Sequence, residues 1–196
     1  DQLLGGSGDD EIDGGASTDH IYGDNGLRYT LGFYDVPGPA MLSIVTEADP
    51  ATLNATTGDA LAAAGSDTIR TGGSAVVVAD FGRIVQAPGD RALMELGPVV
   101  EVSTVRDADG GTDTVTGGIG RDWVLAGAGA DSVETSGGDD LIFGDVGTFT
   151  ADPDGTRDSA TAQGTPGAGD RIDAGDGSDW ILGGAAGDVI ATFGGR

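Results

Sequence analysis

Aliphatic residues recur along the chain at intervals of nine, and each of them follows an aspartate by two positions. Two segments show the full pattern, GGSGDDEID (residues 5–13) and GGIGRDWVL (residues 117–125), with glycine at places one, two and four, aspartate at place six and Ile or Val at place eight. Glycine permits tight turns, and side chains alternate along a strand, so place eight is expected to point inward from a strand of about three residues. The pattern predicts a solenoid of turns and short strands around a narrow aliphatic core.

Further copies of the nine-residue pattern fill much of the remaining sequence. One glycine is replaced in GGASTDHIY (14–22), AGAGADSVE (126–134) and AGDGSDWIL (174–182). Weaker copies are AAAGSDTIR (62–70), ADGGTDTVT (108–116), TSGGDDLIF (135–143), TPGAGDRID (165–173) and GGAAGDVIA (183–191). The segment TGGSAVVVA (71–79) keeps the spacing but carries Val76 where the aspartate belongs, so this copy is expected to stack without binding metal.

The aspartates at place six are candidate metal ligands. Glycine-rich turns bring several carbonyl oxygens towards one point, and a carboxylate adds a hard oxygen, which is the ligand type that Ca²⁺ prefers. The chain has no cysteine and only one histidine, His20, so the usual zinc and copper ligand sets cannot be assembled. The predicted ligands are Asp1, Asp10, Asp19, Asp67, Asp113, Asp122, Asp131, Asp140, Asp170, Asp179 and Asp188.

In these nonapeptides the chain resembles the RTX family, the hemolysin-type calcium-binding repeats of secreted bacterial proteins. The resemblance covers about half of the residues and does not extend into the segments between the repeats. It implies an all-β fold of parallel β-roll blocks, bound Ca²⁺ and an extracellular or cell-surface location. It also implies a role in the stalk or repeat region of a giant adhesin or surface fibre protein.

The formal net charge of −24 supports a role for the metal in folding. Such self-repulsion opposes compaction unless cations neutralise it, so calcium is expected to be part of the fold. The same charge argues against nucleic acid as a partner, because phosphates would be repelled. The sequence contains no run of 18 apolar residues, which predicts no membrane span, and it lacks a leader and an initiator Met, which indicates an interior fragment.

The nine-residue phase is lost at GDNG (23–26), ADFG (79–82) and GDVG (144–147), so roll blocks are expected to alternate with insertions in three modules. Asp24 and Asp145 in these motifs are either turn caps or extra calcium ligands. Alternating polarity predicts short strands or hairpins in the first two insertions, and the third is expected to be a polar loop with one strand near 148–150. The predicted segments are roll 1–22, insertion 23–61, short degenerate roll 62–79, insertion 80–107, roll 108–143, polar loop insertion 144–164 and roll 165–196.

Places seven and nine should face outward, and on one face of the roll they are apolar. Trp123 and Leu125 lie two repeats before Leu141 and Phe143, which predicts a stacked apolar ladder. A surface of this kind is normally covered. The chain's own insertions are the expected cover, and the alternatives are a lateral partner on the Trp and Leu faces or a carbohydrate that stacks on tryptophan. His20, at another outward place, is expected to be a surface or interface residue and not a catalytic base.

The sequence contains none of the common catalytic motifs and is not expected to be an enzyme. Three functions remain: a calcium-rigidified structural repeat, a secretion and folding domain of a toxin or hydrolase, and a ligand-binding adhesive module. The end of the chain, TFGGR, and its start, DQLL, join in phase as one nonapeptide. This join predicts a head-to-tail array of copies, either continued covalently or docked as a filament, with neighbouring copies as the main partner.

Overall fold

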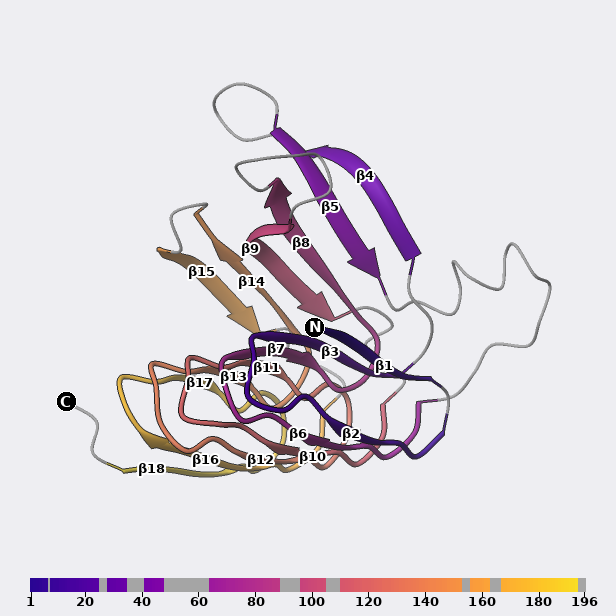
Figure 1. Cartoon of the computed structure of the whole chain (residues 1–196). Coiled ribbons are helices and arrows are strands. Elements are labelled where there is room, and N and C mark those ends of the chain that lie inside the picture. Colours follow the sequence, from indigo (N-terminus) through magenta and orange to yellow (C-terminus); the bar gives the residue numbers. More distant parts are fainter. Residues whose placement is uncertain are drawn as a thin grey trace.

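The structure is a computed structural model that describes residues 1–6, 8–24, 28–34, 41–47, 64–88, 96–104, 110–152, 156–162 and 167–193. All regular elements in these ranges are β-strands (Figure 1), which confirms the predicted all-β class. Within the same ranges, no helix is long and apolar enough to cross a membrane.

Two parallel sheets of six strands form the roll. Sheet A contains, in spatial order, β1 (Gln2–Gly6), β3 (Asp19–Asp24), β7 (Ala75–Val78), β11 (Trp123–Leu125), β13 (Leu141–Phe143) and β17 (Trp180–Leu182). Sheet B contains β18 (Val189–Phe193), β16 (Arg171–Asp176), β12 (Ser132–Glu134), β10 (Thr114–Thr116), β6 (Thr68–Arg70) and β2 (Glu11–Asp13). The chain alternates between the two sheets, so each pair of strands is one rung of a solenoid (Figure 1).

The place-eight residues form the core between the two sheets, as the nine-residue pattern predicts. Val124 pairs with Ile142 in sheet A, and Val115 pairs with Val133 in sheet B. All four are at most 1% exposed and belong to a single buried aliphatic cluster that runs through the roll. The cluster is continuous across all three insertions, so the roll blocks stack into one body.

The insertions build a third sheet, which is antiparallel. Sheet C contains, in spatial order, β15 (Arg157–Ala162), β14 (Gly147–Ala151), β9 (Leu96–Thr104), β8 (Gly82–Pro88), β5 (Met41–Glu47) and β4 (Arg28–Tyr34). Each insertion contributes one pair of strands to it. Sheet C stands above sheet A in Figure 1, on the side of the roll away from sheet B.

Sheet C covers the outer face of sheet A. A second buried cluster joins Trp123, Leu141 and Phe143 of the roll to Val102 and Phe149 of sheet C. The expectation that the chain's own insertions cover the apolar ladder is confirmed for this part of the face. Trp180, at the β17 edge, is 44% exposed and is not covered to the same extent.

Two details of the sequence prediction were wrong. The third insertion is not mainly a polar loop, because β14 and β15 pair as an antiparallel hairpin whose side chains Phe149 and Ala151 are buried. In the degenerate copy, Val76 pairs with Trp123 at place seven, and Ala75 occupies the place of the aspartate. The turn before Ala75 is one residue shorter than the turn before Asp122, which shifts the register of the repeat.

Candidate metal sites

The place-six aspartates form two rows, one at each side of the roll where the chain enters a strand. The row that leads into sheet B is complete, and we call it the unbroken row: Asp10, Asp67, Asp113, Asp131, Asp170 and Asp188. The row that leads into sheet A has Ala75 at one rung, and we call it the interrupted row: Asp1, Asp19, Asp122, Asp140 and Asp179. All eleven predicted residues therefore lie at equivalent positions of successive turns.

Each aspartate in the unbroken row is tied to the next by a hydrogen bond to the backbone. The amide of Asp113 donates to Oδ1 of Asp131 at 2.8 Å, and the amide of Asp131 donates to Oδ1 of Asp170 at 2.9 Å. The same bond joins Asp10 to Asp67, Asp67 to Asp113, and Asp170 to Asp188. The predicted pairs Asp113 with Asp131 and Asp170 with Asp188 are thus neighbours, and the row also continues across insertions, which the sequence did not reveal.

The second carboxylate oxygen of most row members is buried without a partner. Eight of them leave Oδ2 in this condition: Asp10, Asp19, Asp67, Asp113, Asp122, Asp131, Asp170 and Asp179. An ionised carboxylate that is withdrawn from water and left with an unsatisfied oxygen is strongly destabilising. A regular series of such oxygens indicates that a bound cation completes their coordination.

Glycine at place one leaves the space that such a cation needs. A Cβ added to Gly117 would lie 2.5 Å from Asp122 Oδ2, and one added to Gly14 would lie 2.8 Å from Asp19 Oδ2. A Cβ added to Gly5 would meet both Asp10 Oδ2, at 2.7 Å, and the carbonyl oxygen of Gly23. Carboxylate and carbonyl oxygens therefore converge in the space that a Cβ would occupy in any other residue. A set of such oxygens fits a hard metal ion.

Repulsion and burial show that the rows are unstable as bare anions. Burial, and after it repulsion from neighbouring aspartates, raises the pKa of Asp113, Asp122 and Asp131 from 3.8 to about 7. The backbone amides that donate to these carboxylates lower the pKa but only partly offset burial. At neutral pH the fold needs protons or cations in both rows.

The metal would depend on the backbone as well as on side chains. Among the residues that the structure describes, no three His, Asp or Glu side chains gather closely enough to hold a metal by themselves. Carbonyl oxygens of the turns must supply the remaining ligands, which suits Ca²⁺ with its six to eight oxygens better than a tetrahedral zinc site.

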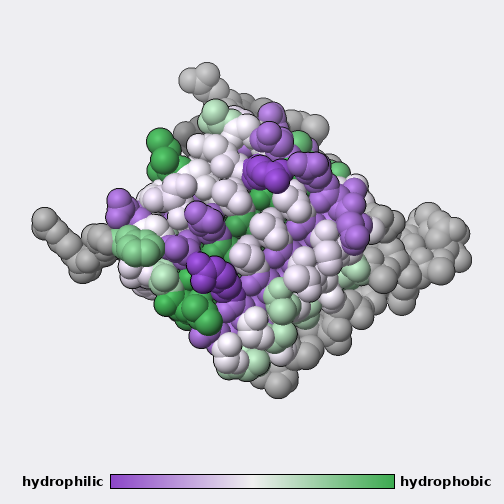
Figure 2. Space-filling view, turned by 90° about the horizontal axis from the view of Figure 1, so that it is seen from below, coloured by the Kyte–Doolittle hydropathy of each residue, from purple (hydrophilic) through white to green (hydrophobic). Residues whose placement is uncertain are grey.

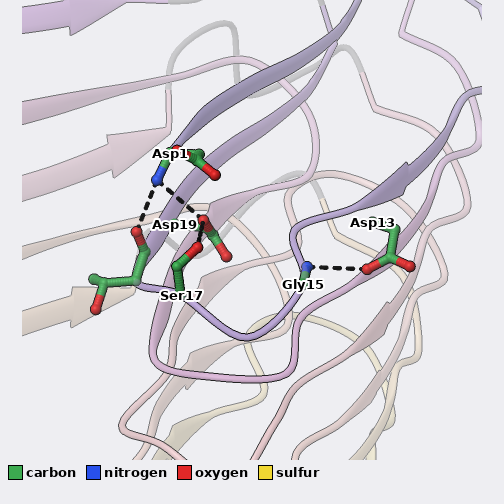
Figure 3. Close-up of polar contacts among 6 residues, drawn as sticks. Asp1, Asp13, Gly15, Ser17 and Asp19 are labelled. Carbon is green, nitrogen blue, oxygen red and sulfur yellow. Dashed lines mark hydrogen bonds and ion pairs between the residues drawn. The ribbon is translucent and has the colours of Figure 1, made fainter.

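The backbone hydrogen bonds of the interrupted row continue past the rung that has Ala75 in place of aspartate. The amide of Ala75 donates to Asp122 Oδ1 at 2.8 Å, and the amide of Asp19 donates to the carbonyl of Ser74 at 3.2 Å. At the end of this row, the nitrogen of Asp1 lies 3.0 Å from Asp19 Oδ1, in the position that a backbone amide has in the other rungs (Figure 3). The predicted neighbours Asp1 and Asp19 are thus adjacent.

Three further buried aspartates mark the places where the insertions leave the roll. Asp24, Asp80 and Asp145 stand at place two of turns that run from sheet A to sheet B. In uninterrupted turns this place is held by glycine with positive φ, as in Gly127 (105°) and Gly184 (110°), and the chain turns back at once. The three aspartates do not have positive φ, and after each of them the chain departs into sheet C.

These place-two aspartates accept hydrogen bonds from the chain where the roll resumes. Both oxygens of Asp24 accept the Gly65 amide, at 3.1 and 3.0 Å. Asp80 accepts the Gly111 amide through Oδ1 at 2.9 Å and the Ala128 amide of the next rung through Oδ2 at 2.8 Å. The two carboxylates close turns that the insertions have opened. Sequence reasoning left Asp24 undecided and missed Asp80, although ADFG has the same form as GDNG and GDVG.

His20, which was expected to be a surface or interface residue, is 9% exposed and lies near Pro98 and Val99 of sheet C. Burial, and after it the positive charge of the N-terminus, lowers the pKa of His20 from 6.5 to about 4, so the imidazole is neutral at pH 7. His20 contributes no metal ligand in this structure.

Comparison with known proteins identifies the nonapeptides. A family model described as RTX calcium-binding nonapeptide repeat (4 copies) matches residues 1–27, 107–142 and 155–192, just over half of the chain. These ranges include every predicted ligand except Asp67. No curated protein and no solved structure shows significant similarity to the chain. The repeats of this family bind calcium, and the metal that fits the two rows is therefore calcium.

Proposed function

The chain belongs to the RTX family of calcium-binding nonapeptide repeats, and on that premise we propose that it is a calcium-rigidified stalk or fibre segment of a large extracellular bacterial protein. The observation that supports the proposal is the unbroken row, in which six aspartates follow one another along the roll without a gap, the middle four of them buried. Ions bound along this row would cross-link every rung to the next. We further propose that the segment has no catalytic activity.

The requirement for calcium supports an extracellular location. Calcium sites built largely from carbonyl oxygens fill at the millimolar concentrations found outside cells and stay mostly empty in a cytosol that keeps calcium low. With the rows empty, a chain of net charge −24 would repel itself. The fold would then form only after export.

Neighbouring copies are the proposed partners. The first rung exposes the edges of β1 and β2, and the last exposes the edges of β17 and β18. A next copy in phase would place β1 beside β17 and β2 beside β18, and would bring Asp1 next to Asp179. It would also cover the exposed side chains Trp180, Ile190 and Phe193. Figure 2, which views the molecule from the side of sheet B, shows hydrophobic surface concentrated towards one edge of a mainly polar face.

The array can be tested with two copies joined directly, so that TFGGR runs into DQLL. Small-angle scattering in millimolar calcium should show a rod of about twice the length of one copy, and chelation should replace it with an expanded chain. The matched control carries four added glycines at the join, which breaks the nine-residue phase. Equal flexibility of the direct and the glycine-separated pairs in calcium would contradict the proposal.

A cavity supports the adhesive module as a second candidate. It measures about 480 Å³ and is lined by His20, Arg121 and Trp123 together with residues at the start of β9. A ligand held there would contact one cation and two aromatic rings. Titration with acidic and neutral monosaccharides, followed by chemical shifts of the Trp123 indole, tests this candidate, and unchanged shifts for both classes would eliminate it.

A further inference from the structure

We propose that sheet C continues from one copy into the next, so that β4 of the following copy pairs with the edge of β15 and covers Trp180. The proposal rests on the proposed array of copies and deepens it. It gives the array a second interface, which the nonapeptide repeats do not provide. The partner is a second copy of this chain in the same orientation.

The two edges of sheet C have the directions that such a continuation needs. β4 lies at the β1 end of the roll and β15 at the β17 end (Figure 1). All neighbouring strands of this six-stranded sheet are antiparallel, so β4 and β15 run in opposite directions. A copy added by translation along the roll would therefore place its β4 antiparallel to β15.

The three sheets also share one repeat distance. Sheets A, B and C contain six strands each in the part of the chain that the structure describes. With a spacing of about 4.8 Å between strands, each sheet would reach the next copy after the same distance, about 29 Å. Continuation of sheet C therefore needs no change in the continuation of the roll.

The strands of sheet C cross those of sheet A obliquely. A Cβ added to Gly147, at the start of β14, would meet the ring of Phe143 in β13, so β14 begins over β13. Two residues further along β14, Phe149 lies against Trp123 of β11, which is the neighbour of β13 on the side towards β1. At this level sheet C is displaced by one strand relative to sheet A.

This displacement leaves β17 to be covered by a next copy. Counted from the β4 and β1 edges, β14 is the fifth strand of sheet C and lies over β11, the fourth strand of sheet A. The sixth strand, β15, then belongs over β13, and the strand over β17 is the first strand of the following copy, β4. The exposed fractions agree with this count, because Trp123 is 7%, Leu141 of β13 is 0% and Trp180 of β17 is 44% exposed.

The register of sheet C identifies the position in β4 that would lie over Trp180. Phe149 belongs to a row of directly paired residues with one member in each strand: Ala160, Phe149, Val102, Ile84, Thr46 and Tyr29. Directly paired residues share one face of a sheet. In the array, Tyr29 of the next copy would follow Ala160 in this row and would take the position over Trp180 that Phe149 has over Trp123.

The first test places a single tryptophan at the join of two directly linked copies. Trp123→Phe in both copies and Trp180→Phe in the second copy leave only Trp180 of the first copy. In millimolar calcium, the Stern–Volmer constant of this indole for acrylamide should be severalfold smaller than that of one copy carrying only Trp123→Phe. Circular dichroism in calcium verifies that both proteins fold.

The second test is a disulfide between the two edges, in a chain that has no cysteine of its own. Ala160→Cys in the first copy and Tyr29→Cys in the second should form a bridge on mild oxidation, because directly paired positions in neighbouring strands lie within disulfide range. The matched control exchanges the two substitutions between the copies, which puts the cysteines at the outer edges of the pair. Bridged protein is detected by its mobility in non-reducing electrophoresis, and the control should form no bridge within the chain.

The array and the continuous sheet can fail separately. If small-angle scattering in calcium shows no rod for the joined pair, the array is contradicted and the continuous sheet with it. If the pair is a rod but Trp180 is quenched as in a single copy, or the two cysteine arrangements bridge equally, sheet C does not continue and only the rolls stack.

Discussion

Trp123 meets Phe149 edge to face, with ring centroids 4.7 Å apart and planes inclined by 68°. The contact joins β11 of the roll to β14 of sheet C, so it links the roll to the sheet that covers it. Aromatic pairs in this geometry stabilise by about 0.5 to 1.5 kcal/mol beyond the burial of their area. Unfolding of the roll is therefore expected to disturb the packing of sheet C as well.

Replacing Trp123 with Ala should destabilise the calcium-loaded fold by about 3 kcal/mol, because the indole is buried against a second layer. Trp180→Ala, at a half-exposed position, should cost clearly less. The free energy of unfolding in urea at fixed calcium measures both. Emission provides a check: Trp180→Phe protein, which retains Trp123, should resist a soluble quencher, and Trp123→Phe protein should be quenched readily.

Removal of calcium should unfold the roll. Empty rows would leave buried carboxylate oxygens unpaired beside like charges, and the narrow core cannot compensate for that cost. Circular dichroism should show a β-rich spectrum in millimolar calcium and loss of that spectrum in chelator. An unchanged spectrum in chelator would show that the fold does not need the metal.

Asp131→Asn should weaken calcium binding at the centre of the unbroken row and lower the melting temperature in calcium by several degrees. Oδ1 of Asp131 accepts the amide of Asp113, and Oδ2 is buried without a partner, where we expect the calcium ion to bind. Glu134→Gln, three residues later, is the control, because it removes the same charge from an exposed side chain. If both variants melt alike, net charge and not ligation governs stability.

Gly117→Ala should weaken a calcium site without any backbone strain. The added methyl group would stand 2.5 Å from Asp122 Oδ2 and 2.7 Å from Thr135 Cγ2, and overpacking of this kind typically costs about 1 to 3 kcal/mol. Gly187→Ala is the control, since nothing lies within 4 Å of the new Cβ. Calcium-dependent melting curves compare the two, and equal tolerance would mean that the space beside Gly117 is not used.

Acid should stabilise the calcium-free fold. The pKa of Asp113, Asp122 and Asp131 is raised from 3.8 to about 7 in the fold, so the folded chain binds protons more tightly than the unfolded chain. This contribution is fully present below about pH 4 and is lost as the pH rises through 7. Calcium-stripped protein should therefore recover β-rich structure at pH 5 that it lacks at pH 7.5, as measured by circular dichroism and thermal melting.

The calcium-loaded protein should respond in the opposite direction. Protons compete with the metal for the same carboxylates, so the rise in melting temperature caused by calcium should shrink as the pH falls towards 5. Melting curves of calcium-loaded and calcium-stripped protein, measured over one pH series, test both pH dependences. A stripped protein that gains stability with rising pH would contradict the raised pKa values.

The sequence was sufficient for the roll because each rung repeats one local rule. The glycine turn, the aspartate at place six and the inward residue at place eight, such as Val124, all follow from spacing. The stacking of Trp123 on Leu141 follows from the same period, because strands of one sheet recur every second repeat. These features need no information from distant parts of the chain.

Features that depend on long-range pairing were not predictable in this way. The bond between Asp67 and Asp113 spans an insertion, and nothing in either repeat specifies that the chain returns in register. The one-residue deletion before Ala75 was misread because the glycines alone suggest an unaltered nonapeptide. Asp80 was missed because a buried carboxylate that accepts two backbone amides has the same local signature as a polar turn.

All three insertions leave the roll on turns that run from sheet A to sheet B, and all rejoin it at the next rung. Successive strands of a sheet lie about 4.8 Å apart, so six of them span only about 24 Å. Residues added within an insertion widen the cross-section of the molecule and leave the length of the roll unchanged. The length and the width of this molecule can therefore change independently. Duplication of nonapeptides would lengthen the roll, while growth of an insertion would thicken it.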